Sequence, residues 1–335
     1  SPAFQVAAQR TVASYTDYDA LRSFAGKVDV VTYEFENVPA ETAAFLAGRV
    51  VLAPGVAALQ TSQDRVAEKT FISGLGLPVA PFAPVWDERE LEDAIGRIER
   101  PSILKTRRFG YDGKGQTRID GRKNAATAWA EIGRAPAVLE GFVTFDREIS
   151  VIAARGWDGE IAIYDVPENH HENHILRTST VPAGIAAATA KRAREIGGRI
   201  IAALDYVGVI GIELFVAGDD VIVNEIAPRV HNSGHWTMDA CSVSQFEQHI
   251  RAICGWPLGS PERLADTGGR TRHGPSSLWQ GGSPPGPENG PFQPRDPSTG
   301  LKSCANPPPN SGPFWVLFAS LSTLRSSEVA LASRC

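Results

Sequence analysis

Two glutamates, Glu213 and Glu225, have the spacing in this chain that points most directly to chemistry. They belong to two apolar segments, residues 207–216 and 220–227, predicted to be strands joined by a three-residue turn that begins at Gly218. Such a hairpin places Glu213 opposite Glu225. Because facing carboxylates repel each other, the pair predicts a cation between them. Oxygen ligands favour a hard ion such as Mg²⁺, which phosphates and water usually complete.

The hairpin alone leaves a second interpretation open, in which both glutamates simply point to solvent. Alternation along the second strand predicts that Val221, Val223 and Glu225 share one face. Asn224 adds a neutral oxygen beside the acidic pair. The choice between a metal site and a solvated face therefore depends on the residues around the hairpin.

The segment after the hairpin, residues 227–236, gathers polar donors into a short loop. Arg229 can hold an oxyanion through two parallel hydrogen bonds, and Asn232 can add an amide donor. His231 can donate a hydrogen bond or move a proton near neutral pH. Beside a metal site these residues predict a pocket for a small anion. The alternative is an ordinary capping loop.

Residues 110–116 form a glycine-rich turn with one cation, Lys114. The backbone N–H groups of Gly110, Gly113 and Gly115 suit a lid that closes over phosphates. A tight hairpin turn would use the same residues, so this motif is weak by itself. Its spacing matches neither the P-loop nor the G-x-G-x-x-G pattern of nicotinamide-binding proteins.

Two lysines and two glutamates extend the candidate site. Lys105 lies on a predicted strand, where an unpaired ammonium would be costly, so it predicts a phosphate partner. Lys69 is a second candidate, although a surface lysine is the commoner interpretation. Glu140 and Glu148 could accept hydrogen bonds from a base or ribose, or be ordinary strand-end charges. The histidine-rich tract at residues 168–174 favours a polar loop over a metal site.

The elements that must position these residues divide the chain into three parts. Residues 1–60 alternate strand and helix patterns, as in part of a doubly wound sheet, but without its opening strand and glycine-rich turn. We therefore expect this part to be truncated. Residues 61–265 carry the candidate site. Residues 266–335 form a tail dense in Gly, Pro and Ser, expected to be aberrant and disordered.

Within these parts, the patterns predict the elements that matter for the site. Strands are expected at residues 27–35, 101–106, 137–143 and 147–154. Helices are expected at residues 61–77, 185–204 and 243–253.

Composition excludes several classes of protein. The 335 residues carry a net charge of −5, which argues against a general nucleic-acid binder. No apolar run is long enough to span a bilayer, so no membrane role is expected. The four cysteines have no metal or disulfide spacing, which predicts reduced thiols and a cytoplasmic protein.

Five strings together resemble a known family: YEFENVP, KTRRFGYDGKGQ, HILRTS, YVGVIGIELF and NEIAPRVHNSGHW. Their order is similar to that of the ATP-grasp superfamily. Within it, the chain most resembles the 5-(carboxyamino)imidazole ribonucleotide synthases of purine biosynthesis, over roughly residues 1–265. The resemblance implies an α/β protein with an ATP-grasp fold, in which α+β subdomains clasp ATP. A partial doubly wound parallel-sheet domain would precede it.

The same resemblance implies a ligase that uses ATP and Mg²⁺. Its members carboxylate 5-aminoimidazole ribonucleotide with bicarbonate, through carboxyphosphate, and release ADP and phosphate. The ATP site is then expected to comprise Lys69, Lys105, Gly110, Gly113, Lys114, Gly115, Glu140, Glu148, His171 and Asn224. Glu213 and Glu225 would bind magnesium, and Arg229, His231 and Asn232 would surround bicarbonate or carboxyphosphate. Tyr111, Asp112 and Glu36 would approach the aminoimidazole ribonucleotide.

The resemblance also implies a homodimer, and it ends where the tail begins. Nothing after Asp266 resembles the family's C-terminal domain with its basic run, so an intact ATP site beside an impaired ribonucleotide site is expected. Two alternatives remain. One is another ATP-grasp carboxylase or formate-dependent transformylase, and the other is a nucleotide-binding pseudoenzyme.

Overall fold

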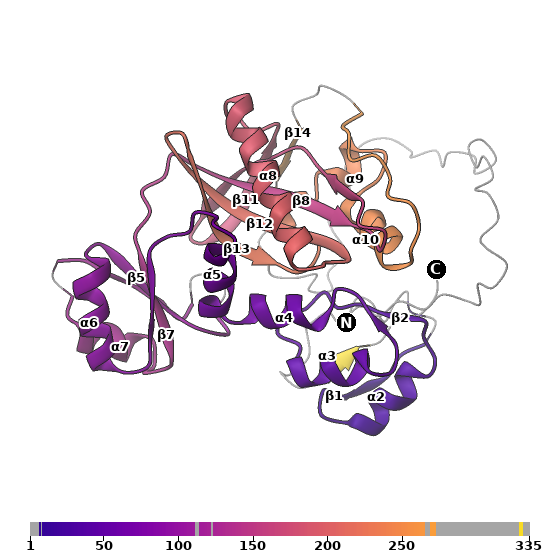
Figure 1. Ribbon diagram of the computed structural model, residues 1–335, viewed down its shortest axis with the longest axis horizontal. Coiled ribbons are helices and arrows are strands. Elements are labelled where there is room, and N and C mark those ends of the chain that lie inside the picture. The colour runs from indigo at the N-terminus through magenta and orange to yellow at the C-terminus, as the bar shows by residue number, and fades with distance from the viewer. Residues whose placement is uncertain are drawn as a thin grey trace, which may run out of the picture.

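The computed structural model describes residues 7, 9–110, 114–121 and 123–264, together with the backbone of two short strands at 269–272 and 328–330. Helices and sheets alternate through three units, which confirms the predicted α/β class. Figure 1 shows the four-stranded lobe at the left, the large sheet in the centre and the N-terminal unit at the lower right. Within the described residues, no helix is long and apolar enough to cross a membrane.

The N-terminal unit is built on a short parallel pair, β2 (Val30–Val31) and β3 (Val51–Leu52). Three helices pack around this pair: α2 (Tyr18–Ala25), α3 (Ala40–Ala47) and α4 (Val56–Gln63). The strand expected at residues 27–35 is therefore much shorter than predicted, because β3 offers it only two partner residues. A separate strand, β1 (Val12–Ser14), pairs antiparallel with β15 (Glu328–Ala330).

The lobe is an antiparallel sheet in the order β4-β7-β5-β6. Its strands are β4 (Phe82–Val85), β5 (Ser102–Thr106), β6 (Gln116–Ile119) and β7 (Ala137–Gly141). Two helices, α6 (Glu88–Ile98) and α7 (Ala125–Glu131), cover one face. In α6 the buried residues Leu91, Ala94 and Ile95 follow helical spacing, so one stripe of the helix enters the core.

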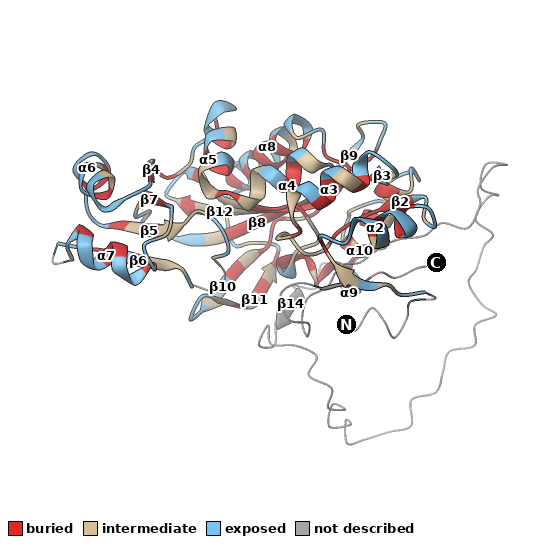
Figure 2. Cartoon of the chain, turned by 90° about the horizontal axis from the view of Figure 1, so that it is seen from below, coloured by how far each residue is buried: buried red, intermediate tan, exposed pale blue. Residues whose placement is uncertain are grey.

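The large sheet runs in the order β13-β12-β8-β10-β11-β14, with β9 paired to β8. Its strands are β8 (Arg147–Arg155), β9 (Ile161–Ile163), β10 (Glu168–Glu172), β11 (Ile175–Val181), β12 (Gly208–Ala217), β13 (Asp220–Ala227) and β14 (Gly269–Arg272). The helix α8 (Ala187–Ala203) packs on one face through Ile196 and Ile200. The other side carries η1 (Asn232–Gly234), α9 (Thr237–Ala240) and α10 (Gln245–Ile253). Buried positions concentrate on β8 and β12, in the middle of the sheet (Figure 2).

Most of residues 266–335, the expected disordered tail, lies outside the described residues. Within that range the structure places β14, which pairs with β11, and β15, which pairs with β1.

The single helix predicted at residues 61–77 is wrong, because the chain breaks it at Asp64. The helix α4 ends at Gln63, and α5 (Arg65–Gly74) begins directly afterwards. Asp64 itself is extended, and its carboxylate caps α5 by accepting hydrogen bonds from the backbone of Val66 and Ala67. A cap inside the predicted helix therefore starts a second helix in a new direction.

The acidic hairpin has the predicted pairing but a different turn. Only Gly218 and Asp219 connect the strands, with Gly218 at a φ of 59°. A bulge at Asn224 then restores the pairing of Glu213 with Glu225. The bulge also shows that the shared face predicted for Val221, Val223 and Glu225 is wrong. The two valines are buried, whereas Glu225 lies on the face of Glu213.

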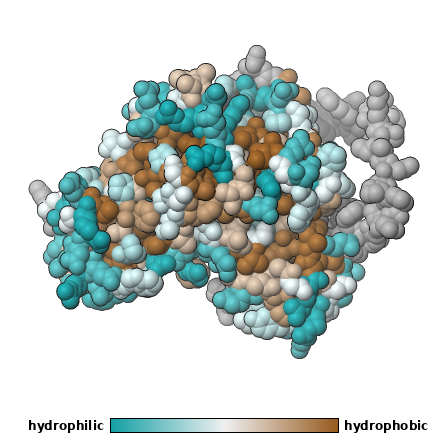
Figure 3. Space-filling model, viewed as in Figure 1, coloured by the Kyte–Doolittle hydropathy of each residue, from teal (hydrophilic) through white to brown (hydrophobic). Residues whose placement is uncertain are grey.

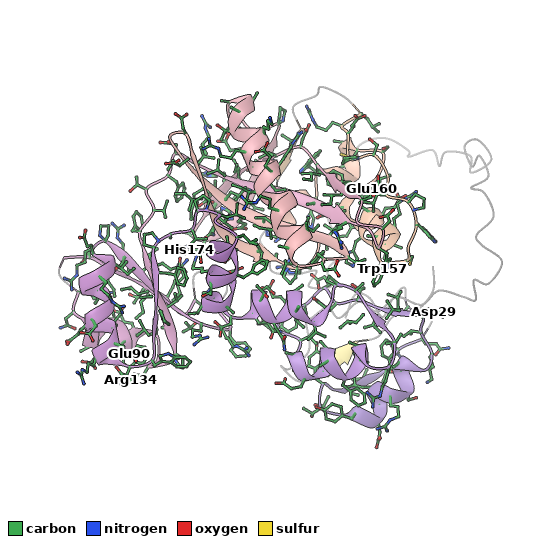
Figure 4. All side chains as sticks on the ribbon, in the orientation of Figure 1. Asp29, Glu90, Arg134, Trp157, Glu160 and His174 are labelled. Carbon is green, nitrogen blue, oxygen red and sulfur yellow. The ribbon has the colours of Figure 1, made fainter. Side chains whose placement is uncertain are left out.

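The histidine-rich tract at residues 168–174 is a strand with its turn rather than a polar loop. Residues 168–172 form β10, which pairs with both β8 and β11. The turn that follows, where His174 lies, points from the large sheet toward the lobe (Figure 4). The tract therefore forms part of the surface on which the candidate site is built.

His249 joins the N-terminal unit to the large sheet. Its Nδ1 accepts a hydrogen bond of 3.0 Å from the backbone N–H of Val209, and its Nε2 lies 2.8 Å from Thr32 Oγ1. Because Val209 can only donate, the neutral ring carries its proton on Nε2 and donates to Thr32. Burial lowers the pKa of His249 to about 4.

We expect this histidine to make the protein less stable in acid. Below the ordinary pKa of 6.5 the unfolded chain binds a proton before the folded chain does, so stability falls as the pH drops toward about 4. The full difference corresponds to about 3 kcal/mol. Urea unfolding at pH 7 and pH 5 should show a smaller loss of stability for His249→Gln than for the unsubstituted chain. Equal losses in the two proteins would contradict this role.

Candidate active site

The acidic pair lies on β12 and β13, where Glu213 and Glu225 are register partners. Their side chains are partly exposed, at 22% and 42%. Glu213 accepts a hydrogen bond of 3.5 Å from Asn224 Nδ2 and lies 3.3 Å from His231 Nε2. Glu225 accepts a hydrogen bond of 3.1 Å from Arg65. In this state, cationic and polar side chains offset the repulsion between the carboxylates.

Glu213 is held in its charged form. Burial raises its pKa, but the hydrogen bond from His231 and the charges that His231 and His171 carry when protonated outweigh burial. Together they lower the pKa of Glu213 to about 2. A carboxylate that stays ionised under all ordinary conditions is suited to hold a cation.

The chemistry of this pair fits magnesium. The donors are carboxylate oxygens, which hard cations prefer, and the side chain of Asn224 lies beside them with its amide nitrogen toward Glu213. Within the described part of the chain, no group of three or more His, Cys, Asp or Glu side chains could hold a metal alone. An ion between Glu213 and Glu225 would therefore need further ligands from phosphate and water, which is how Mg²⁺ usually binds at nucleotide sites.

Lys69 and Lys105 converge on one carboxylate. Their Nζ atoms lie 3.3 and 3.0 Å from Glu140 Oε2, and Lys69 also donates to the carbonyl of Asn224 at 3.3 Å. Lys69 is only 2% exposed, so its interpretation as a surface lysine is wrong. Burial raises the pKa of Glu140, but Lys105 and Lys69 hold it below the ordinary value.

This cluster has unused capacity for an anion. Two ammonium groups face one carboxylate, which leaves one positive charge in excess. Glu140 Oε1 is buried and has no hydrogen-bond partner among the described residues, which is costly unless a donor fills the position. The cluster therefore offers cations for a phosphate and an acceptor for a hydroxyl or amino group.

Glu148 and His171 form a second pair beside the acidic hairpin, joined by a short contact between the carboxylate and Nδ1. Burial lowers the pKa of His171, but its hydrogen bond to Glu148 and the charges of Glu148, Glu213 and Glu225 raise it overall. The structure thus brings His171, the one ATP candidate taken from the histidine-rich tract, to the acidic pair.

Arg229 joins the candidate site to the N-terminal unit. Its Nε and Nη2 both lie 3.1 Å from Glu36 Oε2, and its Nη1 donates to the carbonyl of Val230 at 3.0 Å. The structure therefore places the candidate for anion binding against the candidate for ribonucleotide binding. Asn232 lies in η1 and is exposed.

Only part of the glycine-rich turn is described, because Tyr111, Asp112 and Gly113 lie outside the described residues. Gly110 accepts a hydrogen bond of 3.2 Å from Arg65, and Lys114 is exposed. Gly115 has a φ of 67°, and a Cβ there would lie 2.7 Å from Thr106 Oγ1. Only glycine fits this position without a shift of its neighbours.

Sequence reasoning missed two charged residues of α5. Arg65 links Glu225 to Gly110, and the carboxylate of Glu68 accepts a hydrogen bond of 2.7 Å from the backbone of Ile226. Burial, followed by the charge of Glu225, raises the pKa of Glu68 to about 8. The signal was present: Arg65, Glu68 and Lys69 are spaced i, i+3 and i+4, so they share one helix face.

These contacts place the candidate residues where the three units meet. The lysine–glutamate cluster joins α5 and the lobe to β13, and Arg229 reaches the N-terminal unit. In the space-filling view the outline is indented along its lower edge, between the lobe and the N-terminal unit (Figure 3).

Comparisons with known proteins agree with one another. The ATP-grasp domain family matches residues 70–246, and the ribonucleotide synthetase preATP-grasp domain family matches residues 1–63. The N5-carboxyaminoimidazole ribonucleotide synthase of Brucella melitensis biotype 1 is 53% identical over 268 residues, covering 79% of this chain and 74% of that protein. The Pseudomonas aeruginosa enzyme of the same name is 44% identical over 255 residues, covering 76% and 70%.

The solved structures give the same result. An ADP complex of an N5-carboxyaminoimidazole ribonucleotide synthetase matches with a TM-score of 0.73 and 42% sequence identity. The match covers 75% of this chain and 67% of that one.

Proposed function

The chain belongs to the N5-carboxyaminoimidazole ribonucleotide synthase family of ATP-grasp ligases, and from this premise we propose that the site on β12 and β13 carries out the family's reaction. The ATP-grasp fold, the ligase class and the use of ATP with Mg²⁺ predicted from the sequence are confirmed. The reaction is the ATP-dependent carboxylation of 5-aminoimidazole ribonucleotide in purine biosynthesis.

The reaction has two steps in this proposal. A bicarbonate oxygen attacks the γ-phosphorus of ATP, which releases ADP and forms carboxyphosphate. The amino group of the ribonucleotide then attacks the carboxyl carbon, and phosphate leaves. The site must therefore hold a triphosphate, a small anion and an amine in one line.

Glu213 and Glu225 would hold Mg²⁺, which neutralises phosphate oxygens and so favours phosphoryl transfer. Their opposed register is the observation that carries this assignment. Arg65 and His231 pair with these carboxylates in the structure, which keeps both side chains in place at the site.

Lys69 and Lys105 would contact the phosphates of ATP. Their shared carboxylate, Glu140, holds both ammonium groups in place while leaving one positive charge in excess. Glu148 and His171 would contact the same nucleotide from β8 and β10, with Gly110, Gly113, Lys114, Gly115 and Asn224 completing the ATP site.

Arg229, His231 and Asn232 would surround bicarbonate and carboxyphosphate. The guanidinium of Arg229 is held at Glu36, which we place beside the ribonucleotide together with Tyr111 and Asp112. This contact would bring the anion next to the amine that it carboxylates.

Three further parts of the proposal concern the whole chain. We assign residues 1–60 to the domain before the ATP-grasp domain, residues 61–265 to the ATP-grasp domain and residues 266–335 to an aberrant tail rich in Gly, Pro and Ser. We also propose that the chain forms a homodimer and acts in the cytoplasm, because both follow from its family and pathway.

A coupled assay of ADP release tests the function. With ATP and Mg²⁺, release should require both bicarbonate and 5-aminoimidazole ribonucleotide. Release driven by formate without bicarbonate would instead identify a transformylase. Tight ATP binding in calorimetry without any ribonucleotide-dependent release would identify a pseudoenzyme.

Arg229→Lys should separate bicarbonate use from ATP binding. Lysine keeps the charge but cannot form the planar fork, so we expect the KM for bicarbonate to rise roughly tenfold or more. ATP affinity should stay unchanged. Arg147→Lys is the matched control, since Arg147 pairs with Glu168 at 2.6 Å in the same sheet. A similar bicarbonate KM in the two variants would contradict the role of Arg229.

A further inference from the structure

A network of hydrogen-bonded side chains runs from the acidic pair into the large sheet. From Glu213 it passes to His231, whose Nδ1 lies 2.8 Å from Ser233 Oγ. Ser233 Oγ lies 2.6 Å from Ser150 Oγ, which accepts a hydrogen bond of 3.0 Å from Asn169. The network thus links β12, η1, β8 and β10 through side chains alone.

The network continues on β11, where Ser179 Oγ lies 2.8 Å from Asn169 Oδ1. Ser150, Ser179 and Ser233 are each 0% exposed, and Asn169 is 7% exposed. Because water cannot replace a lost partner in such an interior, each link is costly to leave unmade.

The contacts of the two ring nitrogens of His231 determine which group donates and which accepts in each hydrogen bond of this network. The ionised carboxylate of Glu213 can only accept, so the Nε2 that faces it carries the proton. On the other side, the backbone N–H of Ser233 points at Nδ1 over 3.3 Å and can only donate. The neutral ring therefore keeps a lone pair on Nδ1, whose nearer partner is the hydroxyl of Ser233 at 2.8 Å.

The tautomer of His231 fixes which group donates and which accepts in each of the remaining hydrogen bonds. Since Nδ1 accepts, the hydroxyl of Ser233 donates to it and must accept from Ser150. Ser150 has then used its only proton, so it accepts from the amide nitrogen of Asn169, whose oxygen faces Ser179. All donors point toward Glu213, and reversing one link would leave two donors or two acceptors facing each other.

Contacts outside this network hold the backbone of His231, so the network controls only the orientation of the ring. Gln245 accepts from the His231 N–H at 3.0 Å and donates to its carbonyl at 2.7 Å. The ring lies against Gly211, where a Cβ would come within 2.6 Å of His231 Cβ. With the backbone fixed, the hydrogen bonds of the ring set which nitrogen faces Glu213.

We propose that Ser150, Asn169 and Ser233 are positioning residues for the magnesium carboxylate Glu213. They hold His231 with Nε2–H toward that carboxylate and so orient its oxygens for the metal. The proposal rests on the proposed function only for the magnesium role of Glu213. Partners that orient a metal-binding carboxylate typically change metal affinity by ~10–100-fold when removed.

Nitrogen NMR of the full chain, labelled with ¹⁵N-histidine, tests the tautomer without metal or substrate. Long-range ¹H–¹⁵N spectra distinguish protonated from unprotonated ring nitrogens, and His231→Asn identifies the His231 signals by their loss. The unsubstituted chain should show His231 with Nε2 protonated. In Ser150→Ala and Ser233→Ala these signals should move toward an average of the two tautomers.

Calorimetry of ATP binding at increasing MgCl₂ tests the consequence. For Ser150→Ala, the Mg²⁺ concentration that gives half-maximal ATP binding should rise roughly tenfold. Ser102→Ala is the matched control, because Ser102 is also a strand serine at 0% exposure, but its Oγ has no hydrogen-bond partner in the part of the chain that the structure describes. That control should leave both the His231 spectrum and the Mg²⁺ dependence unchanged.

Two results would overturn the proposal. One is an Nδ1-protonated His231 in the unsubstituted chain, which needs no variant to be folded. The other is a Ser150→Ala protein whose spectrum and Mg²⁺ dependence match those of Ser102→Ala. Neither measurement uses the ribonucleotide, so a failure of the carboxylation assay would leave both able to decide.

Discussion

Glu225→Gln is expected to weaken Mg²⁺-dependent ATP binding roughly a hundredfold, the equivalent of about 3 kcal/mol lost from the metal contacts. Glutamine has nearly the same shape as glutamate but no charge. It therefore removes one of the two anionic ligands and leaves Glu213 alone on the facing strand. The bound ion would then lack the charge that holds it between protein and phosphate. Calorimetry with ATP at fixed MgCl₂ measures this loss directly.

The control for this variant is Glu168→Gln. Glu168 also lies in the large sheet and pairs with an arginine, Arg147, at 2.6 Å, as Glu225 pairs with Arg65 at 3.1 Å. Its substitution should leave ATP affinity unchanged. Removing Mg²⁺ with excess chelator should bring the unsubstituted chain close to the affinity of Glu225→Gln. If Glu225→Gln bound ATP as tightly as the control, the metal assignment would be wrong.

The acidic hairpin shows what local sequence can and cannot predict. Alternating apolar residues placed both strands correctly, and Glu213 does face Glu225. The turn, however, is one residue shorter than predicted, and a bulge at Asn224 compensates for it. A bulge depends on how a strand fits its neighbours, so the residue pattern of the strand alone does not predict it. The predicted pairing is correct because the shorter turn and the unpredicted bulge shift the register by one residue in opposite directions.

Long-range pairing explains most of what the sequence did not reveal. Lys69 looked like a surface residue because its partner, Glu140, lies 71 positions away in another unit. Glu36 and Arg229 are separated by 193 positions and meet only because the N-terminal unit packs on the large sheet. Such contacts are decided by tertiary packing, which overrides local preference.

The serines and the asparagine behind His231 carried no sequence signal at all. A serine on a strand is ordinary, and its chemistry here depends on a neighbour in another strand or in η1. The opposite case is α5, where Arg65, Glu68 and Lys69 follow a helical spacing that could have been recognised. Spacing within one element is visible in a sequence, whereas spacing between elements becomes visible only with the fold.

Lys105→Met should give the second large effect, and it tests whether the lysine–glutamate cluster serves the nucleotide. Methionine keeps much of the volume of the side chain but removes the charge. We expect ATP affinity to fall roughly tenfold to a hundredfold, because a charge-assisted contact to phosphate contributes ~1.5–3 kcal/mol. Calorimetry with ATP measures the loss.

Lys105 is more informative than Lys69, because loss of the fully buried Lys69 would combine a binding effect with a folding effect. Removing one partner of a buried ion pair can cost ~3–5 kcal/mol of stability. In Lys105→Met, by contrast, Glu140 keeps Lys69 at 3.3 Å, so the unfolding temperature should change little. Lys123→Met is the control, since Lys123 pairs with Glu131 at 2.6 Å in the same lobe. If Lys105→Met lost stability but bound ATP like this control, Lys105 would serve only to neutralise Glu140.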